Sequence, residues 1–151
     1  MQLSTRGRYA VMALVDLAAQ AREGTAQRER LAEIAARQGI NPAYLEQLFA
    51  RLRRAGLVIS ARGPTGGYGL ARPPEAISIA AVIRAVDEGD PGAEACCLDA
   101  GGAGDADCPT AALWQALCVH VHRFLDGISI ADVIAGRFGD AVLPPRPREA
   151  A

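Results

Sequence analysis

A short break between two helical patterns most constrains how this chain can fold. Residues 31–38 carry apolar side chains at helical spacing, and Gly39 favours the end of a helix directly after them. Asn41 followed by Pro42 is typical of a helix N-cap with proline in the first turn. A turn of only about four residues therefore joins two helices, which is the pattern of a helix-turn-helix.

The second helix of this pair has an apolar stripe that predicts which side faces outward. The stripe consists of Leu45, Leu48, Phe49 and Leu52. On the opposite side, Gln47 could pair with adenine and Glu46 could accept from cytosine in a major groove. Tyr44 and Arg51 could hold phosphates. An ordinary solvated helix face is the alternative interpretation.

A predicted β-hairpin follows this helix. Residues 57–60 and 68–71 have the composition of short strands, and a Gly/Pro-rich turn at 61–67 joins them. A hairpin in this place is a wing, and the Arg62 guanidinium at its tip could enter a minor groove. A nucleotide-binding glycine loop is the alternative, but no Gly-Lys-Ser/Thr ending follows the glycines. The predicted DNA-contacting set is therefore Asn41, Ala43, Tyr44, Glu46, Gln47, Arg51, Arg62, Gly63 and Pro64.

The charges of the chain are divided between its two halves. Residues 1–72 contain 11 arginines and 5 acidic residues, whereas residues 73–151 contain 5 arginines and 12 acidic residues. A basic N-terminal half is typical of nucleic-acid binding, and the acidic half is expected to face away from phosphates. A solvated basic face is the alternative.

Several function classes do not fit the sequence. No apolar run approaches the roughly 18 residues of a membrane span, and no signal region opens the chain, so we expect a cytoplasmic protein with no membrane partner. No Gly-x-Ser-x-Gly and no His-Glu-x-x-His occurs, and we expect no enzyme. Four cysteines clustered in the C-terminal half are too few for a secreted disulfide framework, and they favour ligands or redox thiols.

Four blocks of sequence resemble the IscR-like family of iron–sulfur cluster regulators, which also contains NsrR. They are LSTRGRYAV at 3–11, YLEQLF at 44–49, GLV at 56–58 and RGPTGGY at 62–68. The resemblance implies a mainly α fold, a winged helix-turn-helix with a two-stranded wing and a long C-terminal dimerisation helix. It also implies a homodimer that binds palindromic, double-stranded promoter DNA as a repressor or an activator, with contacts at Tyr44, Glu46, Gln47 and Arg62.

The rest of the chain completes the expected organisation. Ser78 can cap a helix that ends near residue 87, and a glycine-rich, cysteine-bearing loop follows. A long helix then carries an apolar stripe from Leu113 to Leu125. In the IscR-like pattern this helix pairs with the same helix of a second subunit; the alternative is that it packs only on its own domain. The expected parts are a DNA-binding domain at 1–88, a sensor loop at 89–111, a dimerisation helix with a following short helix at 112–137 and a disordered tail at 138–151.

The cysteines match the cluster-binding relatives in part. Those relatives place three cysteines with five residues between each, and a histidine three positions after the last. Cys96 and Cys108 match the outer two, while Gly102 stands at the middle position and Ala111 at the histidine position. With the neighbouring Cys97 as the third ligand, the resemblance implies an iron–sulfur cluster of the 2Fe–2S type.

The cysteines also allow other interpretations. Cys118 lies on the apolar stripe and is expected to be a buried thiol rather than a ligand. A cysteine-thiol switch without a cluster, a zinc site, and a thiol oxidoreductase or metal carrier are the alternatives. An oxidoreductase would need a Cys-x-x-Cys pair of low pKa, which the adjacent Cys96 and Cys97 do not provide.

Overall fold

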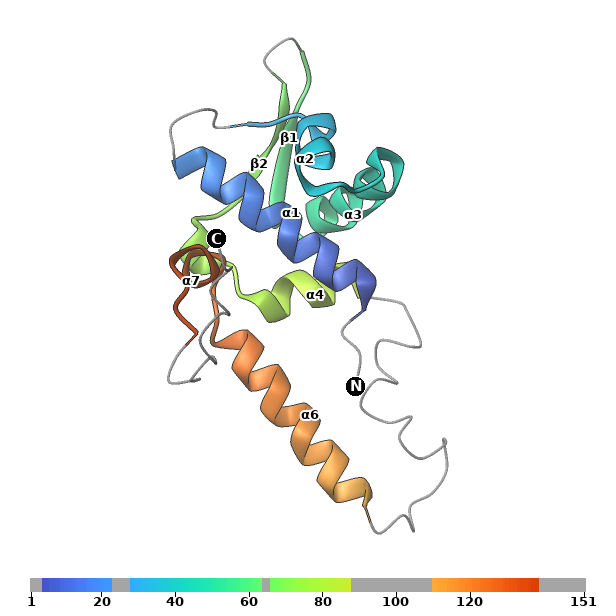
Figure 1. Cartoon of the computed structure of the whole chain (residues 1–151), viewed down its shortest axis with the longest axis vertical. Coiled ribbons are helices and arrows are strands. Elements are labelled where there is room, and N and C mark those ends of the chain that lie inside the picture. The colour runs from blue at the N-terminus through green and yellow to red at the C-terminus, as the bar shows by residue number, and fades with distance from the viewer. Residues whose placement is uncertain (1–3, 23–27, 64–65, 88–109, 139–151) are drawn as a thin grey trace, which may run out of the picture.

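The computed structural model describes residues 4–22, 28–63, 66–87 and 110–138 (Figure 1). This part of the chain is mainly helical, with a single two-stranded antiparallel sheet among its described residues. None of the described helices is both long and apolar enough to cross a membrane. The elements are α1 (Thr5–Arg22), α2 (Leu31–Gln38), α3 (Pro42–Arg54), β1 (Val58–Ala61), β2 (Gly67–Leu70), the short 3-10 helix η1 (Pro74–Ala76), α4 (Ile79–Asp87), α6 (Ala111–Asp126) and α7 (Ile130–Ala135).

The helix-turn-helix forms where the sequence predicts it. Helix α2 ends at Gly39, whose φ of 63° is readily adopted only by glycine. The Asn41 side chain then caps α3, since its Oδ1 accepts from the backbone N–H of Ala43 at 2.9 Å and of Tyr44 at 3.4 Å. The stripe of α3 is confirmed as core, because all four of its side chains are at most 1% exposed: Leu45, Leu48, Phe49 and Leu52.

The wing is held against the helices at its base. Strands β1 and β2 pair with Val58 opposite Leu70 and Ala61 opposite Gly67. Glu29 adds a single bridge to this sheet, since its backbone exchanges hydrogen bonds of 2.9 and 2.7 Å with Tyr68. A Cβ at Gly67 would lie 2.5 Å from the Glu29 carbonyl oxygen, so only glycine permits this close approach.

Helix α1 lies at the centre of the domain and contacts elements on both of its sides (Figure 1). The helix-turn-helix and the wing lie on one side, and α4 and α7 on the other. Ser78 caps α4 by accepting from the Ala81 N–H at 3.2 Å, as predicted. Backbone bonds from Ile79 to Ile128 and from Ile130 to Ile77 tie the link between α6 and α7 to this region. Helix α6 extends outward beyond α4 (Figure 1).

An ion-pair network joins α1, α2 and the base of the wing. Arg37 Nη2 donates to Asp16 Oδ2 at 2.7 Å and also to the carboxylate of Glu29. Both acids are nearly buried, with side chains 11% and 6% exposed. The hydrogen bonds that the Arg37 guanidinium donates, first to Asp16 and then to Glu29, raise its pKa above the ordinary value. Arg37 therefore pairs with two carboxylates that would otherwise be desolvated without a cationic partner.

Replacing Arg37 with methionine is expected to lower the free energy of unfolding by about 1–3 kcal/mol, because two nearly buried carboxylates lose their partner. Arg84→Met is the matched control, since Arg84 pairs with Asp126 in an exposed salt bridge (68% and 61% exposed) and should cost less than about 1 kcal/mol. Urea denaturation measures both variants. Equal losses in the two would contradict a stabilising role for the network.

Candidate DNA-binding surface

One side of α3 is open to solvent and carries side chains able to read base edges. Ala43, Glu46 and Gln47 are exposed, opposite the buried stripe. Asn41 is also exposed, although its side-chain oxygen serves as the helix cap. The N-terminal part of the helix therefore presents one carboxylate and one amide on a rigid and capped element, as a recognition helix does.

The wing tip lies beyond α3 in the sequence and carries the basic side chain predicted there. Arg62 and Gly63 are exposed, and Gly63 adopts a φ of 109°. The turn is tight, because a Cβ at Gly66 would lie 2.5 Å from the Ala61 carbonyl oxygen. Pro64, the remaining predicted wing residue, lies outside the described residues.

A direct side-chain bond joins the recognition helix to the wing. Arg53 Nη1 donates to Ser60 Oγ at 3.2 Å, from the last turn of α3 to strand β1. The two predicted reading elements are thus also connected outside the core.

The flank of α3 that faces α1 is partly buried. The Tyr44 ring meets the Tyr9 ring edge to face, with centroids 6.0 Å apart. An open groove of about 480 Å³ lies between the two helices, and it is lined by Ser4, Thr5, Arg6, Tyr44, Gln47, Leu48 and Arg51. Tyr44, whose ring is packed against Tyr9, and Gln47, which is exposed, therefore both border this groove from α3.

Arg51, predicted as a phosphate contact, has a partner inside the protein. Its Nη1 donates to the carbonyl oxygen of Val86 in the last turn of α4, at 2.7 Å. The neighbouring Asp87 is buried, 8% exposed, and its carboxylate accepts from Ser4 Oγ at 2.7 Å. Arg6 lies 4.0 Å from the same carboxylate. These contacts at the end of α4 were not predicted from the sequence, in which the residues lie far apart.

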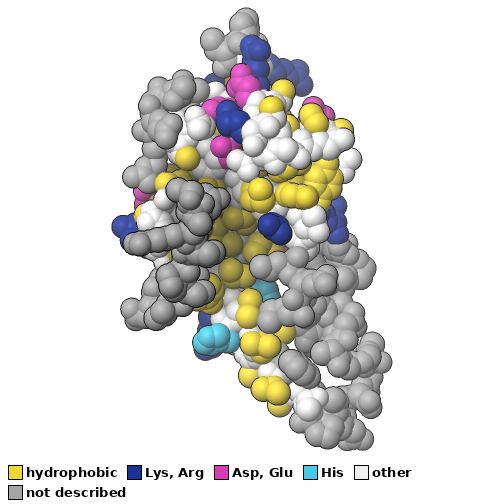
Figure 2. Space-filling model, viewed as in Figure 1, with side chains coloured by type: hydrophobic (Ala, Val, Ile, Leu, Met, Phe, Trp, Pro, Cys, Tyr) yellow, Lys and Arg dark blue, Asp and Glu magenta, His cyan; other side chains and the backbone are white. Residues whose placement is uncertain are grey.

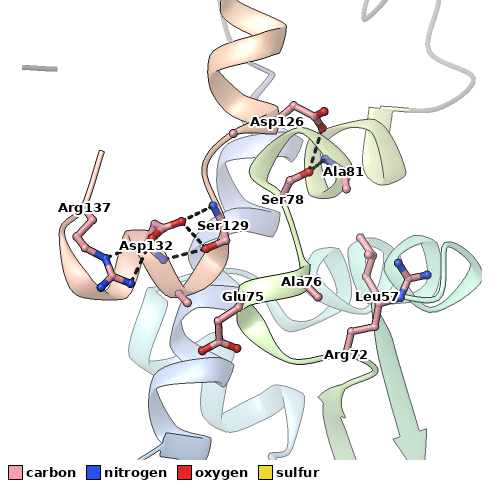
Figure 3. A pocket seen from close by; sticks show the side chains of 12 residues that line it. Leu57, Arg72, Glu75, Ala76, Ser78, Ala81, Asp126, Ser129, Asp132 and Arg137 are labelled. Atoms are coloured by element: carbon pink, nitrogen blue, oxygen red, sulfur yellow. Dashed lines mark hydrogen bonds and ion pairs between the residues drawn. The ribbon is translucent and has the colours of Figure 1, made fainter. Parts of the chain in front are cut away.

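A second open groove, of about 570 Å³, lies around η1 and α7 (Figure 3). Several polar groups on its wall serve as helix caps. Ser78 Oγ accepts from the Ala81 N–H and donates to the Asp126 carboxylate, while Ser129 and Asp132 form a capping box at the start of α7. The capping box lowers the pKa of Asp132, first through the hydrogen bond that its carboxylate accepts from the Ser129 hydroxyl. The polar groups of this groove are therefore explained by the capping of α4 and α7.

Apolar side chains gather along α6 (Figure 2). Among the described side chains of this helix, four large apolar ones are exposed: Leu113 at 60%, Leu117 at 37%, Val119 at 45% and Phe124 at 44%. Cys118 is only 9% exposed, so its expected burial on this helix is confirmed. Cys96, Cys97 and Cys108 lie outside the described residues, and within the described ranges no cluster of three or more potential metal ligands occurs.

Comparison with known proteins identifies the family. Residues 3–136 match the family model of Rrf2, described as "Iron-dependent Transcriptional regulator". The chain belongs to the Rrf2 family. It is 47% identical to the HTH-type transcriptional regulator IscR of Aliivibrio salmonicida, over 89% of this chain and 77% of that protein. It is 46% identical to the IscR of Cereibacter sphaeroides, over 89% and 87% of the two chains.

The structure of T. potens IscR resembles that of this Rrf2 protein, with a TM-score of 0.71 and 35% identity over 95% of this chain and 93% of the other. The IscR-like resemblance inferred from four sequence blocks is therefore confirmed, and so is the winged-helix fold. As a member of this family the protein is a DNA-binding regulator of transcription.

Proposed function

We propose that this Rrf2 protein is a homodimer that reads palindromic promoter DNA and responds to iron–sulfur or redox status. The observation that carries the proposal is the capped helix α3, which exposes Glu46 and Gln47 beside a wing with an exposed arginine. We expect the protein to act in the cytoplasm and to regulate transcription without catalysing a reaction.

The proposed DNA contacts follow from the shape of this surface. Helix α3 enters a major groove, where Ala43, Glu46 and Gln47 meet base edges. The wing approaches the neighbouring minor groove through Arg62, with Gly63 and Pro64 allowing the backbone to come close. At the edge of α3, the N-cap residue Asn41 and Tyr44 are expected to contact the phosphates of the DNA.

The exposed stripe of α6 supports the homodimer. At 100° per residue, Leu113, Leu117 and Phe124 lie within about 40° of one another on the helix. Such a stripe is costly to leave in water, and a second copy of α6 across a two-fold axis would cover it with an identical stripe. A dimer of this kind would place two recognition helices on two half-sites of a palindrome.

The sensing part of the proposal concerns the three cysteines at 96, 97 and 108. Relatives named IscR and a family described as iron-dependent favour iron at this segment. Thiolates are the usual protein ligands of iron–sulfur clusters, so Cys96, Cys97 and Cys108 would hold a 2Fe–2S cluster. When bound, such a cluster would supply a redox-active and oxygen-sensitive centre. A thiol switch of the same cysteines without a cluster is the second candidate, favoured by the glycine and the alanine at two expected ligand positions.

Glu46→Ala and Gln47→Ala are each expected to change discrimination at a single base pair by about 1–3 kcal/mol, because each removes a contact to a base edge. The measurement is the binding of a set of duplexes that differ by one base pair. Gln115→Ala, which removes an exposed glutamine from α6, is the matched control and should leave the preference unchanged. Uniform weakening on all duplexes by either α3 variant would contradict base reading.

Leu117→Asp is expected to dissociate the homodimer, because it places a charge in the apolar contact between the two α6 helices. Gln115→Asp adds the same charge about 160° away from Leu117 on the helix and should leave the dimer intact. Sedimentation velocity at micromolar concentration distinguishes the two states. A monomeric wild-type protein, or a Leu117→Asp variant that remains dimeric, would rule out this interface.

Cys96→Ala and Cys108→Ala are each expected to abolish the visible absorbance of anaerobically isolated protein, since each removes a thiolate ligand of the cluster. Cys118→Ala is the control and should retain it, because Cys118 is a buried thiol of α6. Iron and sulfide analysis accompanies the spectra. The ligand assignment fails if Cys118→Ala alone bleaches the protein, or if wild type contains no iron.

A further inference from the structure

Side-chain hydrogen bonds connect the last turn of α4 to α3 and to the start of α1. From α3, Arg51 donates to the Val86 carbonyl oxygen at 2.7 Å. From the start of α1, Ser4 Oγ donates to the Asp87 carboxylate at 2.7 Å and accepts from the Gly7 N–H at 2.8 Å. We refer to Ser4, Arg51, Val86 and Asp87 as the α4 junction.

The junction is well packed. Val86 is fully buried and Asp87 is 8% exposed. Helix α1 approaches α4 closely beside it, since a Cβ at Gly7 would lie 3.3 Å from the Ile83 side chain. A guanidinium bond to a carbonyl in the last helical turn is charge-assisted and is favoured by the helix dipole. Movement of the end of α4 would therefore be transmitted to both attached helices.

Arg51 is placed to control the reading residues of α3. It lies four residues after Gln47, about one helical turn, and both residues line the groove between α1 and α3. Base-edge hydrogen bonds require donor–acceptor distances of about 2.7–3.2 Å. A small shift of α3 would thus remove sequence-specific bonds while leaving mobile arginines in contact with phosphates.

We propose, on the basis of the proposed DNA-reading function, that Arg51 is a positioning residue for sequence recognition rather than a phosphate contact. It holds α3 on the last turn of α4, and so makes the placement of Gln47 depend on the α4 junction.

The first experiment compares two DNA probes: a duplex selected by the wild-type protein from a random library, and a scrambled duplex of equal length and composition. Arg51→Met is expected to weaken the selected duplex by about tenfold, roughly the loss of one base contact, with little change on the scrambled duplex. The slope of log affinity against log salt concentration should stay as in wild type. Arg84→Met, from the exposed side of α4, should change neither probe.

A phosphate role for Arg51 gives a different result in the same experiment. Arg51→Met would then weaken both duplexes alike and reduce the salt slope by about 1, and that outcome would overturn the proposal. Thermal unfolding of each variant verifies that binding is measured on folded protein.

The second experiment alters the junction from the side of α4. Asp87→Ala removes the acceptor of Ser4 without changing α3, and it is expected to speed amide hydrogen exchange in α3 and to lower preference for the selected duplex. If the alanine variant does not fold, the same measurements are made on Asp87→Asn. Unchanged exchange in α3 would contradict the coupling. Both experiments use the full chain as isolated, whatever its iron content, so their outcome is separate from that of the cluster test.

Discussion

Burial of one stripe of α3 determines how the rest of the reading surface is arranged. With Leu45, Leu48, Phe49 and Leu52 at most 1% exposed, the helix has a single rotational setting, and Glu46 and Gln47 must face solvent. The Asn41 cap fixes where the helix begins. A reading surface of this kind depends on packing that lies beneath it, because the core prevents the base-reading side chains from rotating away.

The elements around this helix are held by polar contacts rather than by the core alone. The backbone of Glu29 bonds strand β2 of the wing, and its carboxylate pairs with Arg37 of α2. Glu29 therefore connects the wing to α2. Arg53 adds a bond from α3 to β1, and Arg51 a bond from α3 to α4. These three arginines have partners within the protein, so the positive charge of the basic domain cannot simply be counted as contacts to DNA.

Local sequence signals predicted much of the fold. The helix-turn-helix, the Asn41 cap, the αL end at Gly39 and the core stripe all depend on residues a few positions apart, where spacing and capping preferences are informative. The predicted strands were displaced by one residue, since the structure has β1 at Val58–Ala61 and β2 at Gly67–Leu70. Such boundaries depend on pairing with the opposite strand, which propensity alone does not determine.

Contacts between distant residues were beyond prediction. Ser4 and Asp87 are 83 residues apart, and Arg51 and Val86 are 35 apart, so no periodicity relates them. Arginine on a recognition helix is an ordinary phosphate ligand, and only the structure gives Arg51 a carbonyl partner in α4. The exposed stripe of α6 was visible as apolar periodicity, but which of its residues remain open to solvent required the packed chain.

Selection of random duplexes by the full chain, followed by sequencing, tests the central claim most directly. A dimer that reads DNA through two copies of α3 should enrich a palindrome whose half-site centres are separated by a whole number of helical turns, about 10 base pairs each. The flanks of each half-site should favour a narrow, A·T-rich minor groove for the wing. Enrichment of no sequence, or of a site without two-fold symmetry, would contradict the account.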